Sequence, residues 1–132
     1  MKPTYKSFEE LLSKNNLNSI NFGYASFYIK FIDGLSEEGE SCWGVTEFDK
    51  YEIKLERSLP IYLGREVLMH EITHVILNLV GFGGYKRDKA GNETPDGYIP
   101  ETTNEFLTEA ITMGMTQAMR LNKHLFKVLI HD

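Results

Sequence analysis

The sequence holds a single cysteine, Cys42, and no long hydrophobic run. One thiol cannot form an internal disulfide or supply the paired cysteines of a zinc knuckle, so a reducing compartment is favoured. No apolar stretch approaches the roughly 18 residues that a membrane helix needs, and residues 1–16 lack the apolar core of a signal peptide. We therefore expect a cytoplasmic protein with no membrane partner.

Basic residues are in the minority, with 14 lysines and arginines against 19 aspartates and glutamates and a formal net charge of −5. Phosphate backbones repel such a chain, so no nucleic-acid partner is expected. The short basic stretch 86–89 contains its own acid and is typical of a solvated loop. Repeats and low-complexity tracts are missing too, and a chain of 132 residues suits one domain over 1–132.

The most informative pattern is His70-Glu71-Ile72-Thr73-His74, an HExxH motif inside an apolar run. Residues four apart on an α-helix lie about 40° apart around its axis, so His70 and His74 present both imidazoles on one face. Neutral imidazole binds zinc, and a catalytic site takes three protein ligands and leaves one position for water. Glu71 lies about 100° round the helix, where it is suited to act on that water as a general base. The motif therefore predicts a Zn²⁺ site.

An ordinary core helix could carry the same residues as a satisfied histidine pair. The flanks of the motif are apolar at 67–69 and 75–77, so a buried helix would leave the two histidines and Glu71 in need of partners. A metal ion supplies those partners, and the zinc site is therefore the favoured interpretation.

Two histidines alone hold zinc poorly, so a third donor must come from elsewhere in the fold. Glu105 and Glu109 are four residues apart and would share one face of a later helix. Glu105 is the predicted ligand, and Glu109 either hydrogen-bonds a zinc histidine or ligates in its place. Alternatively, Glu105 completes a capping box over 102–105 and bonds a backbone amide. Ligands are best held by rigid elements, so the loop acids are weaker candidates: Glu93, Asp96 and Glu101.

Hydrophobic periodicity predicts an α+β fold. Residues 7–10 match a capping box at the start of a helix that ends near 15–16. Alternation from 19 to 32, with a change of phase near 25–26, predicts one long strand or two halves joined by a bulge. Strands are also expected over 42–48 and 51–55, and helices from 61 or 65 to 80, from 103 onward, and over 121–129. The expected core is a small, mostly antiparallel three-stranded sheet packed on the HExxH helix and the glutamate helix that follows it.

The HExxH motif and the later Asn104-Glu105 segment together resemble the gluzincin class of zinc metallopeptidases. In thermolysin-like members a glutamate of this second motif ligates and an acid four residues on supports a zinc histidine; here that acid is Glu109, where those enzymes carry Asp. Over about 42–126 the element order looks like minigluzincins and the ImmA/IrrE-type and phage-encoded HExxH proteins. The resemblance implies a zincin-like fold whose strand with Tyr51, Ile53 and Leu55 forms the upper edge of the cleft, where an extended peptide can add.

The implied activity is peptide-bond hydrolysis by a zinc-bound water, with Glu71 as general base, by an endopeptidase rather than an exopeptidase. An oxyanion donor is also needed, and the candidates are Tyr85, Tyr98 and His124. Residues 81–100, with five glycines and two prolines, are expected to form a surface loop near the metal: a lid, a partner-binding loop or a tolerated insertion. The partner would be a peptide or protein substrate, in the host cytoplasm if the protein is phage-encoded. The alternative function is a catalytically silent, zinc-stabilised protein that binds a regulator or a phage component.

Overall fold

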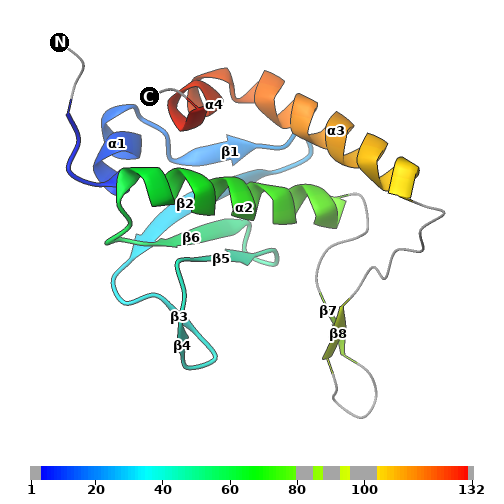
Figure 1. The fold of residues 1–132 in the computed structure, drawn as a ribbon, viewed down its shortest axis with the longest axis horizontal. Helices are drawn as coiled ribbons and strands as arrows, with labels where there is room; N and C mark the ends of the chain where they lie inside the picture. The colour runs from blue at the N-terminus through cyan, green and yellow to red at the C-terminus, as the bar shows by residue number, and fades with distance from the viewer. Residues whose placement is uncertain (1–3, 80–84, 88–92, 96–103, 131–132) are drawn as a thin grey trace.

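The computed structural model describes residues 4–79, 85–87, 93–95 and 104–130 and has an α+β architecture. Its long helix α2 (Ile61–Leu79) lies across a four-stranded sheet, with α1 (Phe8–Lys14) at its N-terminal end and α3 (Asn104–Leu121) running alongside (Figure 1). The remaining elements are β1 (Ser19–Asn21), β2 (Ser26–Ile32), β3 (Ser36–Glu37), β4 (Glu40–Ser41), β5 (Gly44–Glu47), β6 (Glu52–Glu56), β7 (Tyr85–Arg87), β8 (Glu93–Pro95) and α4 (Lys123–Ile130).

The helices follow the sequence closely because their start and stop signals are local. Ser7 caps α1, since its hydroxyl accepts a hydrogen bond from the Glu10 N–H at 3.1 Å, and the Glu10 carboxylate reaches back to the Lys6 N–H at 2.9 Å. Of the two predicted starts of the motif helix, the structure has the earlier one, Ile61, so Gly64 lies in its first turn. The predicted helices from about 103 and 121 are confirmed as α3 and α4.

The segment 19–32 is a hairpin, not a continuous or bulged strand. β1 and β2 pair antiparallel, and the turn between them places Gly23 at a φ of 99°. The Phe22 N–H donates to the Ala25 carbonyl at 2.9 Å, and the Asn21 side chain accepts from the Gly23 N–H at 2.8 Å. The predicted change of phase therefore marks a reversal of the chain, which a left-handed glycine makes possible.

The expectation of a three-stranded sheet is wrong, because the main sheet has four strands in the order β1-β2-β6-β5. The sheet is mixed: β1 with β2 and β5 with β6 are antiparallel, whereas β2 pairs with β6 in parallel. The strand assigned to the cleft edge is also misplaced. β6 lies between β2 and β5, and the side chains of Ile53 and Leu55 are fully buried. Tyr51 precedes β6, at a φ of 55°. Of the strands that the structure describes, β5 forms that edge of the sheet.

The hydrophobic core lies between the sheet and α2. Leu68, Ile72, Val75 and Ile76 form the buried stripe of α2, and none of them is exposed to solvent. They join one core cluster with Phe8 and Leu12 of α1, Phe27 of β2, Ile53 and Leu55 of β6, and Leu125, Phe126 and Leu129 of α4. No helix in the described ranges has both the length and the apolar character needed to cross a bilayer.

Replacing Gly64 tests the packing of α1 on α2. A Cβ at this buried position would lie 2.6 Å from the Cβ of Phe8, which is itself fully buried. Gly64→Ala should therefore lower the free energy of unfolding by about 1–3 kcal/mol, although alanine is the better helix former by about 1 kcal/mol. Urea unfolding measures the change. The loss should shrink in a Phe8→Ala background; a gain in stability in the wild-type background would contradict the packing.

Acid unfolding tests the carboxylate that ties the β2–β3 turn to the start of α2. Hydrogen bonds from the Ser58 N–H at 3.0 Å and the Leu35 N–H at 2.8 Å hold the pKa of Glu56 below its ordinary value of 4.5. The ionised carboxylate therefore adds stability above about pH 4.5 that is lost as the pH falls through the lowered pKa. Glu56→Gln should destabilise the protein at pH 7 and flatten the fall in stability below pH 4.5, both followed by urea unfolding across pH.

Candidate metal centre

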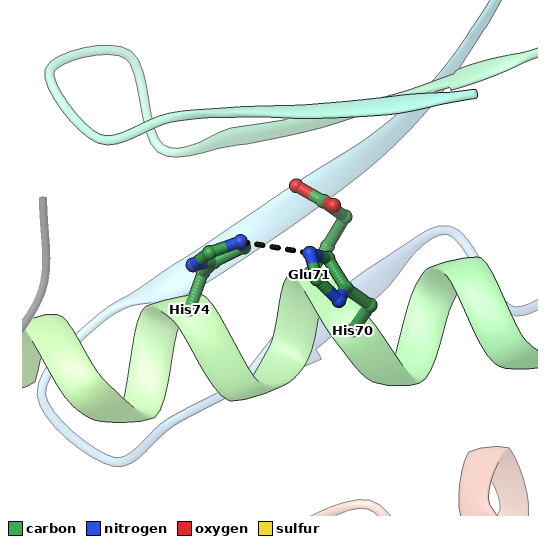
Figure 2. Close-up of side chains that lie close together, drawn as sticks. All are labelled: His70, Glu71 and His74. Carbon is green, nitrogen blue, oxygen red and sulfur yellow. Dashed lines mark hydrogen bonds between the residues drawn. The ribbon is translucent and has the colours of Figure 1, made fainter. Parts of the chain in front are cut away.

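Helix α2 brings His70 and His74 together on one exposed face. Their rings stand edge to face with centroids 4.5 Å apart and planes at 84°, and their Nε2 atoms are 2.9 Å apart (Figure 2). One ring nitrogen donates a hydrogen bond to the other in this arrangement. The helical spacing thus directs the metal-ligating nitrogens of both imidazoles to one point, as the sequence predicted.

The pair fits a divalent metal ion that prefers imidazole. At a zinc–nitrogen distance of about 2.05 Å, a 2.9 Å separation gives an angle of about 90° at the metal. The tetrahedral angle needs about 3.3 Å between the nitrogens, which a small rotation of two exposed rings supplies. Ligand atoms of His70, Glu71 and His74 all lie within 4.8 Å of one another. A metal ion can bind at this group.

The exposure of the two histidines excludes the satisfied core pair. Both imidazoles are open to solvent, whereas the neighbouring α2 residues Ile72 and Val75 are buried. Core packing therefore does not account for the two side chains, and the exposed face leaves room for water or a substrate beside them.

Glu71 is the only buried polar or charged side chain among the described residues, with 5% of its surface exposed. Its Oε1 accepts a hydrogen bond from the Thr46 hydroxyl at 2.8 Å. Figure 2 shows the carboxylate directed away from α2, toward the strands, beside the two imidazoles. The carboxylate is therefore held between helix and sheet while a ligand atom stays close to the histidine nitrogens.

Gly44 explains how β5 comes this close to the motif. A Cβ at Gly44 would lie 2.8 Å from Val67 Cγ1 and 3.2 Å from Glu71 Cγ. Strand glycines often mark such close approaches. Neither Gly44 nor Thr46 was predicted as part of the site, and the glycine within the expected strand 42–48 was the one available signal.

The lone cysteine, Cys42, lies near several carboxylates, one of which is Glu71. Burial, together with the carboxylates of Glu37, Glu71 and Glu56, raises the pKa of the Cys42 thiol. A thiol with a raised pKa stays protonated at neutral pH, and the thiolate is the form that ligates or attacks. Cys42 is therefore poorly suited to serve as ligand or nucleophile here.

A groove of about 500 Å³ runs along β5. Val45, Thr46 and Glu47 of β5 line it, together with Lys54 of β6. Thr46 belongs both to the groove and to the hydrogen bond with Glu71. No described residue of α2 lines the groove, so the strand residue Thr46 is what it shares with the site.

Other predicted site residues are only partly placed. Glu105 and Glu109 fall within α3, but their side chains lie outside the described residues, so the third ligand stays a prediction. Tyr85 is in β7, where only the backbone is described, and Tyr98 is outside the described residues. His124 is exposed on α4 and does not belong to the cluster of His70, Glu71 and His74.

Comparison of the chain with protein-family models, with curated proteins and with solved structures gives no match. The site is therefore interpreted from its own residues and geometry.

Zinc titration tests the histidine pair. The protein should bind one Zn²⁺ per chain, and zinc at about 100 times its dissociation constant should add roughly 2.7 kcal/mol to the free energy of unfolding. His70→Asn and His74→Asn should each weaken binding at least about 100-fold, because one ligand of a small set is lost. Competition with a chromophoric chelator measures the affinity. His124→Asn is the control and should bind zinc like the wild type; equal weakening by all three variants would contradict the site.

Proposed function

We propose that the protein is a zinc-dependent peptidase that hydrolyses peptide bonds, with Glu71 as general base. The observation that carries the proposal is a buried carboxylate held beside two converging, solvent-exposed imidazoles. The exposed imidazoles suit hydrolysis because a water must reach the metal, and the Glu71 carboxylate suits it because a base must lie within reach of that water. Sequence resemblance to gluzincins points to the same chemistry.

His70 and His74 would hold the zinc, with Glu105 proposed as the third ligand and Glu109 as the hydrogen-bond partner of a zinc histidine. When bound, the metal supplies Lewis acidity and lowers the pKa of water from 15.7 toward about 7. Glu71 would accept the proton of the attacking water and pass it to the leaving amine. A carboxylate with one oxygen held by Thr46 keeps its other oxygen for this transfer.

The substrate would be an extended peptide lying along β5. β5 is antiparallel to β6 on one side, and its residues line the groove of about 500 Å³. Added strands gain main-chain hydrogen bonds from a free sheet edge and place alternate side chains in pockets. This role moves from the strand first assigned to the edge, with Tyr51, Ile53 and Leu55, to β5, because β6 is paired on both sides.

The test compares zinc-loaded wild type with Glu71→Gln on a complex peptide mixture, with new termini identified by mass spectrometry. Glu71→Gln should keep its zinc and lose about 10²–10⁴-fold in cleavage rate, because the general base is removed while the imidazoles remain. Glu66→Gln is the matched control: the same change on an exposed residue of α2, which should cleave like the wild type.

Two other outcomes decide against this assignment. Equal cleavage by Glu71→Gln and wild type would show that Glu71 is not the base. Zinc-loaded wild type that cleaves nothing would favour the catalytically silent, zinc-stabilised interaction protein.

A further inference from the structure

We infer that Thr46 is a positioning residue for Glu71: its hydroxyl orients the carboxylate so that the general base faces the metal site and a peptide on β5. This inference rests on the proposed peptidase function and deepens it. Thr46 acts through Glu71 and need not touch the reacting atoms.

The contact joins the correct donor to the correct acceptor. An ionised carboxylate only accepts hydrogen bonds, and the Thr46 hydroxyl donates to Glu71 Oε1 at 2.8 Å. Threonine is β-branched, so its χ1 angle is restricted and the hydroxyl direction is well defined. The last torsion of a glutamate side chain is broad and roughly two-fold, so without a directional partner the carboxylate plane is poorly determined. The hydrogen bond supplies the missing restraint.

Gly44 and Thr46 share this task on one face of β5. They pair with Leu55 and Ile53, whose fully buried side chains mark the face turned toward α2. Because Gly44 has no side chain, the Glu71 Cγ and Cδ atoms can lie against the strand, at 3.2 and 3.4 Å from where a Cβ of residue 44 would be. Two residues further along, Thr46 meets the end of the same side chain. Gly44 makes room for the Glu71 side chain, and Thr46, the next residue on that face of β5, orients it.

The restraint also connects the base to the substrate strand. Thr46 lines the groove along β5, so the strand proposed to pair with the peptide backbone also holds Glu71. A peptide on β5 and the carboxylate are thereby positioned by the same backbone. Effective catalysis needs the base within hydrogen-bond reach of the proton that it removes.

Thr46→Val removes the hydroxyl and keeps the branched shape, and Thr46→Ser restores a hydroxyl. With zinc bound, Thr46→Val should lower kcat about 10- to 100-fold, as expected for loss of a hydrogen bond to a charged group, with KM within about twofold of wild type. Thr46→Ser should recover kcat to within about threefold. Zinc affinity should be unchanged in both variants, because neither touches an imidazole.

Thr73→Val is the matched control. The Thr73 hydroxyl donates to the Met69 carbonyl of its own helix at 2.9 Å, so the same substitution on α2 should leave kcat within about twofold of wild type. A second readout needs neither zinc nor substrate: Thr46→Val should lower the urea midpoint of the wild type and have a smaller effect in a Glu71→Ala background.

Each alternative result overturns the inference in a recognisable way. If Thr46→Val keeps the wild-type kcat, or if Thr46→Ser is as slow as Thr46→Val, the positioning role is rejected. The proposed peptidase function is not affected by either result. Thr46→Val that loses zinc affinity shows a general disturbance of the site. If the zinc-loaded wild type cleaves no peptide, the proposed function is rejected, and the positioning role is rejected with it.

Discussion

The close approach of β5 to α2 at Gly44 is the constraint on which the site depends. Any side chain at Gly44 would meet Val67 and Glu71, so strand and helix could not keep this separation. A wider gap would take the Thr46 hydroxyl out of reach of Glu71 Oε1, now 2.8 Å away, and leave a buried carboxylate without its partner. A buried unpaired carboxylate is costly, so packing and hydrogen bonding support each other here.

Around this contact, neighbouring residues of one helix have opposite environments. Glu71 is buried against the sheet, while His70 and His74 are exposed on the adjoining face of α2. A metal ligand needs an open donor, whereas a carboxylate in a sheltered position interacts more strongly with its partners than one in bulk water. On the outer face of the sheet, the Lys54–Glu47 ion pair at 2.7 Å keeps charge in contact with solvent, away from α2.

The elements that could be predicted from the sequence are those whose signals are local. The capping box at Ser7, the motif helix and the later helices depend on residues three or four apart, and all were predicted with small errors at their ends. The order of the strands could not be predicted. Nothing in residues 51–55 shows that β6 pairs with β2 in parallel and with β5 in antiparallel, because strand pairing joins residues far apart in the chain. The turn at Gly23 was likewise mistaken for a bulge, since both interrupt the alternation of a strand.

By itself, the sequence determined that His70 and His74 share a face and that Glu71 lies beside them, because a helix imposes these angles wherever it is placed. Only the tertiary structure decided that the histidines are open to solvent, that Glu71 is buried, and that β5 is the strand against it. Thr46 is 25 residues from Glu71, and their hydrogen bond exists only because the sheet brings β5 onto α2. Helical geometry is set by neighbours in the chain, whereas burial and strand partners are set by how the whole chain packs.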